Sequence, residues 1–170
     1  MAYGLEGASK DGITGKGVNV AIVDAYNSPT ITADVNAYSR RTGEPTLAPG
    51  QYTDHSAPRK DWTDQKLCGG AVGWHVEQTL DVEAMHGVAP GAHIAFFGAA
   101  NCDTAIDTEL NRIVQTQAAR IVSNSFGFAG EGGLGSEVAL EHSIFVQGAL
   151  EGIGFYFSTG DAGDNTPIGD

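Results

Sequence analysis

The feature that most constrains the fold is a repeated alternation between short apolar runs and longer segments with helical spacing. Runs such as "VNVAIVDAY" and "HIAFFGAA" are rich in β-branched or aromatic residues, which is typical of buried strands. The predicted strands are 17–26, 92–100, 120–127 and 153–160, and the predicted helices are 32–43, 73–86, 102–119 and 135–152. This alternation predicts an α/β fold with a parallel sheet and right-handed crossovers, flanked by helices.

The connections between these elements locate candidate sites. The first two helices are expected to end at Gly43 and Gly87, and Ser136 is expected to cap the last helix. Residues 44–72 are expected to be mostly loop, with room for one short strand. In a parallel sheet, sites form at the carboxyl ends of the strands, which here are Asp24 and the stretches "GAANCD", "SNSFG" and "STGDAGDN".

Length and charge narrow the class of protein. The 170 residues suffice for one substantial core, so one domain or most of one is expected. No apolar run reaches the roughly eighteen residues of a membrane span, and "MAYGLEGASKDG" lacks the pattern of a signal peptide. The formal net charge is −12, with only nine Lys and Arg residues. Nucleic acid and anionic membranes would be repelled and are not expected partners. The acidity fits either a solvated surface or an acidic working environment.

A nucleotide site is not expected. The glycines of "GITGKGVNV" precede the first strand, whereas a dinucleotide fingerprint needs them in the turn after it. That turn is "DAYNSPT", which places Asp24 where a phosphate would sit. A lone Asp at a strand end caps a loop or serves a site, and both roles stay open.

The only two cysteines, Cys68 and Cys102, lie in the polar loops "QKLCGG" and "AANCDT". They do not form a CxxC pair, and two thiols alone make a poor zinc site. Buried free thiols occur more often in apolar runs. A disulfide, and hence a secreted protein, is favoured over two unrelated free cysteines.

The helix predicted for 73–86 carries two acids at an unfavourable spacing. Glu77 and Asp81 are four residues apart, so they share one face, and His75 stands just ahead of them. Like charges at this spacing destabilise a helix slightly. Taken alone, the pair is either a solvated helix face or an acid–base site.

Several motifs in order resemble known peptidases. "GVAPGA", "IVSNSFG" and "STGDAGD" are similar to successive motifs of the subtilisins. "GKGVNVAIVDAYNSPT", "GWHVEQTLDVE", "GVAPGAHI", "IVSNSFG" and "STGDAG" resemble the sedolisins, or serine-carboxyl peptidases, more closely. The resemblance covers essentially the whole chain. It implies that residues 1–170 are the N-terminal part of a subtilisin-like catalytic domain, with its C-terminal part absent.

The resemblance implies roles for three acids. Glu77 would be the general base, Asp81 its orienting partner, and Asp161 the acid that stabilises the oxyanion. An unperturbed Glu titrates near pH ~4.3, so it works as a base in acid, where histidine is protonated. A protonated Asp161 could donate a hydrogen bond to the oxyanion. Adjacent carboxyls that share a proton avoid the like-charge penalty.

The runner-up enzyme is a neutral subtilisin that uses His75 as base together with Asp24. His75 sits where the subtilisin base would fall, but the Glu that the sedolisin pattern requires follows two residues later. A loop or surface role is expected for His75. The other histidines have no metal-ligand spacing and are expected to be structural or exposed; they are His55, His86, His93 and His142.

The strand end "SNSFG" implies substrate contacts. In sedolisins this strand end lines the cleft, so Ser125, Phe126 and Gly127 are candidate substrate-binding residues, with plain packing as the alternative. Sedolisins usually have Trp where Phe126 stands, which implies altered subsite preference.

The nucleophile of the sedolisins lies in Gly-Thr-Ser, a motif that these 170 residues lack. The serines present are in other contexts; they are Ser123, Ser125, Ser136, Ser143 and Ser158. The family's calcium site is formed after that serine, so calcium is expected in the full-length domain and no metal ligand is assigned here. The resemblance implies a secreted, acid-acting endopeptidase with a polypeptide substrate and its own propeptide as partners, and the 170 residues alone are expected to be inactive. A non-catalytic binding or inhibitory module on the same scaffold is the alternative.

Overall fold

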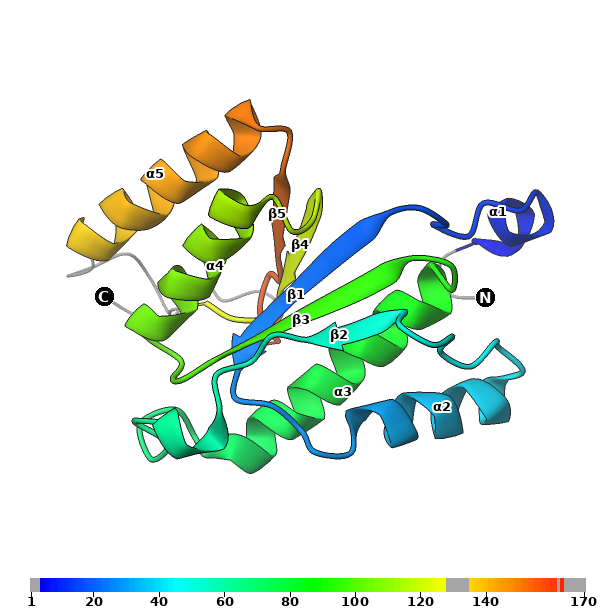
Figure 1. Cartoon of the computed structure of the whole chain (residues 1–170), viewed down its shortest axis with the longest axis horizontal. Coiled ribbons are helices and arrows are strands. Elements are labelled where there is room, and N and C mark those ends of the chain that lie inside the picture. The colour runs from blue at the N-terminus through cyan, green and yellow to red at the C-terminus, as the bar shows by residue number, and fades with distance from the viewer. Residues whose placement is uncertain (1–3, 128–134, 162, 164–170) are drawn as a thin grey trace.

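The computed structural model describes residues 4–127, 135–161 and 163, which form a layered α/β structure (Figure 1). In chain order the elements are α1 (Glu6–Lys10), β1 (Asn19–Ala25), α2 (Ile31–Thr42), β2 (Tyr52–Asp54), the 3-10 helix η1 (Arg59–Asp61), α3 (Ala71–Val88), β3 (His93–Ala99), α4 (Thr104–Thr116), β4 (Ile121–Asn124), α5 (Gly135–Leu150) and β5 (Gly154–Phe157). None of these described helices is long and apolar enough to cross a membrane.

The strands form one parallel sheet in the order β2-β3-β1-β4-β5. β1 lies at the centre, where Val23 pairs with Phe97 of β3 on one side and with Asn124 of β4 on the other. Helices α2 and α3 cover one face of the sheet, and α4 and α5 cover the other (Figure 1). The predicted α/β fold, with a parallel sheet flanked by helices, is confirmed.

The two covered faces of β1 explain why its sequence is apolar at nearly every position. Val23 belongs to a buried cluster with Leu110 of α4. Ile22, one residue earlier, belongs to a second cluster with Val35 of α2 and Val82 of α3. Successive side chains of a strand point to opposite faces, so a strand with helices on both sides must be apolar throughout.

Most predicted elements occur close to their expected bounds, and Gly43 ends α2 as predicted, with a φ of 80°. Gly87 does not end α3, which runs one residue beyond it. The helix stops before Pro90, because a residue that precedes proline avoids helical backbone. Ser136 is not a cap, since α5 begins at Gly135 and includes it. No apolar periodicity predicts α1, which has only five residues.

Gly98 in β3 lies where another part of the chain approaches very closely. A Cβ at this position would overlap the carbonyl oxygen of Tyr26 and the side chain of Ser56. The Gly98 N–H donates a hydrogen bond to the Ser56 hydroxyl. Tyr26 itself has a φ of 63°, which is unusual for a bulky residue and fixes the turn that follows β1. Glycine at 98 is therefore required by space.

We expect Gly98→Ala to lower the free energy of unfolding by about 1–3 kcal/mol, because the added methyl group forces the backbone apart. Gly87→Ala is the matched control, since nothing lies within 4 Å of its Cβ position and alanine favours a helix by up to about 1 kcal/mol. Urea unfolding of both variants checks this. Equal stability of the two variants would contradict the close approach at Gly98.

Acidic side chains meet where α4 packs against α5. Asp107 of α4 is only 5% exposed, and its Oδ2 has no hydrogen-bond partner among the described residues. Burial is the main cause that raises the pKa of Asp107 to about 6, and Glu141, Glu137 and Asp103 add to the rise. The α4–α5 contact therefore favours the protonated form of Asp107.

This contact predicts greater stability in acid. An unfolded Asp titrates near pH ~3.9, so between that pH and about 6 the native state binds more protons than the unfolded state. The free energy of unfolding then falls as the pH rises through this window. Asp107→Asn is expected to raise it by about 1 kcal/mol at pH 7, after allowance for solvent screening, and to change it little at pH 4. Urea unfolding at both pH values measures this, with the exposed Asp11→Asn as control. A loss of stability at pH 7 in Asp107→Asn would argue against it.

Candidate functional site

The predicted catalytic acids lie where the carboxyl ends of β1 and β4 meet the side of α3. Asp24 is the penultimate residue of β1, and Ser125 directly follows β4. The Ser125 hydroxyl donates a hydrogen bond to Oδ1 of Asp81, 2.9 Å away, across 44 residues of sequence. This contact places Asp81 at the end of the sheet where sites form in parallel α/β folds.

Glu77 and Asp81 share one side of α3, one turn apart, as predicted. Both side chains are partly buried. The charge of Glu77 contributes to raising the pKa of both Asp81 and Asp24. We call these three residues, Asp24, Glu77 and Asp81, the carboxyl cluster.

Asp24 is the innermost member of the carboxyl cluster. It is 0% exposed, and neither carboxyl oxygen has a hydrogen-bond partner among the described residues. Burial raises the pKa of Asp24 well above its ordinary value, and the charges of Asp81 and Glu77 raise it further. Because an isolated buried carboxylate is costly, Asp24 is held in its neutral form.

Asp81 is less buried than Asp24 and has one hydrogen-bond partner. Burial raises the pKa of Asp81 to about 6, the hydrogen bond from Ser125 lowers it, and the charge of Glu77 raises it. Its second oxygen, Oδ2, is buried with no hydrogen-bond partner among the described residues. Asp24 and Asp81 therefore retain protons above the range of ordinary carboxyls.

His75 lies on another side of α3. Two residues along a helix correspond to a rotation of about 200°, which turns His75 away from Glu77. Its ring lies 6.4 Å from that of Trp62. Burial and the charge of Arg59 lower the pKa of His75, and a hydrogen bond with the backbone of Asn27 opposes them. His75 therefore lies within α3 with a half-buried ring, so the loop placement expected for it is wrong.

No His–Asp pair of the subtilisin type forms among the described residues. Both oxygens of Asp24 and Nε2 of His75 are buried without hydrogen-bond partners. A histidine base needs such a partner to fix its tautomer and to stabilise its cation. The arrangement therefore disfavours the neutral subtilisin interpretation.

A cross-linked loop supports the N-terminal end of α3. Cys68 and Cys102 form a disulfide with a Cα–Cα distance of 5.5 Å, which confirms the predicted pairing. The indole N–H of Trp74 in α3 donates to the carbonyl oxygen of Cys68 at 2.9 Å. The hydroxyl of Tyr26 donates to the carbonyl oxygen of Thr63 at 2.7 Å. These contacts tie the loop before α3 to the turns that follow β1 and β3.

Removal of this disulfide is expected to cost about 3–4 kcal/mol of stability, because it frees a loop in the unfolded chain whose ends are 34 residues apart. The double variant Cys68→Ser/Cys102→Ser, compared with the oxidised parent by urea unfolding, measures the loss. Two free thiols in the parent protein made under oxidising conditions, detected by mass spectrometry, would refute the cross-link.

Ser125, Phe126 and Gly127 directly follow β4, as predicted, but each has a different environment. The Ser125 hydroxyl is used by Asp81. Phe126 packs edge-on against Phe157 of β5, with ring centroids 5.7 Å apart. Phe157 in turn packs against Phe145 of α5 at 5.4 Å. Phe126 is therefore part of an aromatic cluster that also packs against the core, and Gly127 is exposed.

Asp161 is exposed and lies four residues beyond the end of β5. Among the described residues, no hydrogen bond joins it to Glu77 or Asp81. The structure thus brings two of the three predicted catalytic acids together, adds Asp24 to them, and does not link Asp161 to the carboxyl cluster.

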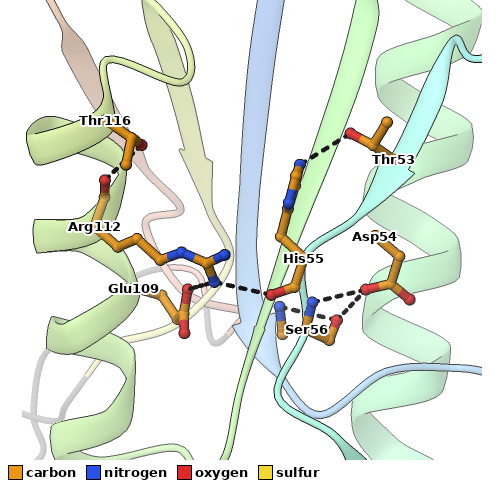
Figure 2. Close-up of polar contacts among 8 residues, drawn as sticks. Thr53, Asp54, His55, Ser56, Glu109, Arg112 and Thr116 are labelled. Carbon is orange, nitrogen blue, oxygen red and sulfur yellow. Dashed lines mark hydrogen bonds and ion pairs between the residues drawn. The ribbon is translucent and has the colours of Figure 1, made fainter.

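A second group of serine, histidine and aspartate follows β2, and it is not a catalytic triad. The Ser56 hydroxyl donates directly to Oδ1 of Asp54, while the His55 ring lies within hydrogen-bond distance of Thr53 and points away from Ser56 (Figure 2). Arg112 of α4 donates to the carbonyl oxygen of His55 at 3.1 Å, which ties this segment to α4 (Figure 2). The group stabilises the edge of the sheet and activates no nucleophile.

Large apolar side chains are exposed on α3 and on the strands β4 and β5 of the described structure. Val72, Val76 and Leu80 follow one another at four-residue spacing on α3, and they are 75%, 66% and 58% exposed. On the strands, Tyr156 of β5 is 62% exposed and Ile121 of β4 is 36% exposed. Ile121 and Tyr156 point to the same face of the sheet, since Tyr156 pairs with Ser123, two residues after Ile121. We call the sheet face that carries Ile121 and Tyr156 the open face.

The described residues contain no group of three or more His, Cys, Asp or Glu residues that could hold a metal ion. The carboxyl cluster is thus not a metal site in this geometry. The calcium that the family resemblance implies has no fitting ligand set among these residues.

Two features of this site could not be predicted from the sequence alone, namely the environment of Asp24 and the contact of Ser125 with Asp81. Asp24 has no hydrogen-bond partner among the described residues, and no sequence pattern around an Asp at a strand end indicates this. The contact of Ser125 with Asp81 depends on how β4 and α3 pack. The motif "SNSFG" marked Ser125 as functional but not as a partner of an acid.

Comparison with known proteins shows the fold. No protein-family model matches the chain, and no curated protein matches it. Among solved structures it is similar to Pseudomonas sedolisin, a serine-carboxyl proteinase complexed with two molecules of pseudo-iodotyrostatin, at 20% sequence identity and a TM-score of 0.68. The match covers 87% of this chain and 40% of that one, so this chain spans less than half the length of its neighbour. The chain therefore has a sedolisin-like fold.

Proposed function

We propose that these 170 residues form the N-terminal part of the catalytic domain of an acid-acting serine endopeptidase of the sedolisin type. Glu77 is its general base, Asp81 positions that base, and Asp161 stabilises the oxyanion. The nucleophilic serine comes from polypeptide outside these residues.

The carboxyl cluster is the observation that carries this proposal. It combines two acids one turn apart on α3 with a third, fully buried acid at the end of β1. Burial raises the pKa of Asp81 to about 6 and that of Asp24 well above its ordinary value. A solvated helix face would not bury unpaired acids in this way, and functional sites are where such perturbed groups gather.

The chemistry follows from the protonation states. Glu77, as a carboxylate, accepts the proton of a serine hydroxyl as the oxygen attacks the peptide carbonyl. Asp81 and Asp24, whose pKa values are raised, carry protons in acid, so a negative charge on Glu77 is tolerated. Glu77 then returns its proton to the leaving amine. Asp161, in its protonated form, donates a hydrogen bond to the oxyanion.

The open face supports an incoming segment that bears the nucleophile. It lies on strands β4 and β5, and Ser125, which directly follows β4, donates a hydrogen bond to Asp81. Apolar surface of this kind is stabilised when other polypeptide covers it. A segment packed there would stand beside the carboxyl cluster.

A polypeptide is the proposed substrate. The backbone of Ser125–Gly127 is available beside Asp81 to pair with an extended peptide. The aromatic cluster of Phe126 and Phe157 offers an apolar contact for a substrate side chain. The disulfide supports an oxidising, extracellular location. A propeptide partner and calcium bound outside these residues belong to the same proposal.

The test compares the 170-residue chain with protein that continues beyond it. We expect the longer protein to hydrolyse a peptide at pH 4 and the 170-residue chain to be inactive, because removal of the nucleophile removes covalent catalysis. Turnover by the purified 170-residue chain that Glu77→Gln abolishes would show that the nucleophile lies within it. A longer protein that binds peptide at pH 4 and never cleaves it would favour a binding module.

A further inference from the structure

A cavity of about 560 Å³ lies at the end of the molecule away from the carboxyl cluster. It is formed by the C-terminal parts of α2 and α3, by α1, and by the segments that lead into β1 and β3. Its volume falls in the range of about 300–1,000 Å³ that is usual for small-molecule sites. Neither the carboxyl cluster nor the open face accounts for this cavity.

The walls of this cavity are mostly apolar. Ala84 and Val88 of α3, Pro90, and Ile13 line it. Ile13 is 67% exposed and Val88 is 49% exposed, so large apolar side chains at the cavity remain in contact with water. An apolar part of a ligand would remove that surface from water.

The charged residues that line the cavity are acidic. Glu44 and Glu83 line it, and no Lys, Arg or His does so among the residues that the structure describes. The α2 and α3 helices both end beside the cavity, and helix C-termini carry partial negative charge. Burial raises the pKa of Glu83, and the charge of Asp34 adds to the rise. The charge of Arg41 in α2, a residue that does not line the cavity, lowers it.

From this combination we infer that the cavity binds an apolar organic ammonium ion. The apolar part lies against Ala84, Val88 and Ile13, and the ammonium group lies beside Glu83 and Glu44. An anion of the same shape would meet two carboxylates and two helix C-termini, so it should be rejected. A neutral alcohol gains the apolar contact alone. The inference is independent of any peptidase activity.

Three probes with one carbon skeleton test this on the 170-residue chain at pH 7. They are 4-phenylbutylamine, 4-phenylbutanol and 4-phenylbutyrate. Titrations followed by methyl NMR are expected to show saturable shifts at Ile13 and Val88. The amine should bind about fivefold or more tightly than the alcohol, as expected for an ion pair that is partly shielded from water, and the carboxylate more weakly than both.

Variants assign the preference to the lining acids. Glu44→Gln/Glu83→Gln should reduce the affinity for the amine to that for the alcohol and leave the alcohol unchanged. Asp61→Asn, which removes one charge from the exposed η1 helix, should leave both unchanged. If the double variant does not fold, the amine-to-alcohol ratio in the parent chain decides alone. Equal or tighter binding of the carboxylate, or no saturable shift with the amine, would overturn the inference.

Discussion

Replacement of Glu77 by alanine, in protein that contains the nucleophile, is expected to lower turnover by about 10⁴-fold at pH 4, because base and nucleophile act as one unit. Asp81→Ala should cost less, since Asp81 positions the base and does not itself move the serine proton. His75→Ala is the matched control on the same helix. It should keep nearly full turnover, because His75 is turned away from Glu77 and packs near Trp62. Turnover of one peptide, after circular dichroism confirms folding, measures all three.

The order of these effects separates the mechanisms. If Glu77→Ala stays nearly as active as the parent while His75→Ala is inactive, the carboxylate mechanism is wrong and a histidine base is required. The structure argues against that order, since His75 Nε2 and both oxygens of Asp24 lack hydrogen-bond partners among the described residues.

Replacement of Asp161 by alanine is expected to lower turnover by about 10²–10³-fold, the loss typical of one oxyanion donor. Asp161→Asn keeps a side-chain donor and should retain part of the activity. Because an amide does not titrate, this variant should also lose less activity as the pH rises. Turnover of the parent and both variants at pH 4 and pH 6 measures this.

Asp61→Asn on the exposed η1 helix controls for the loss of one negative charge. Full activity in Asp161→Ala would remove Asp161 from the mechanism. No hydrogen bond joins Asp161 to the carboxyl cluster among the described residues, so its role is assigned by these activity measurements.

The sequence predicted the sheet because both faces of its strands are covered. A run such as "VNVAIVDAY" must be apolar throughout when Val23 and Ile22 enter different cores, and that signal is local. The end of α2 could also be predicted from local sequence, because Gly43 adopts the left-handed conformation that glycine favours. The end of α3 was misjudged because Gly87 adopts helical backbone there.

The candidate site was only partly predictable, because its electrostatics depend on long-range packing. The spacing of Glu77 and Asp81 fixes their common face. The burial of Asp24 depends on the helices and strands that surround β1, and the Ser125–Asp81 hydrogen bond joins segments 44 residues apart. The half-buried ring of His75 also depends on long-range packing, since it lies near Trp62 and the backbone of Asn27.

The pH–rate profile of protein that contains both the carboxyl cluster and the nucleophile tests the central claim most directly. kcat/KM should be measured for the parent and for Glu77→Gln between pH 3 and pH 8 on one peptide. The account predicts maximal activity in acid that is lost by pH 7, as Asp81, whose pKa is raised to about 6, gives up its proton, and no activity for Glu77→Gln at any pH. Activity that rises through pH 7 and survives in Glu77→Gln would contradict it.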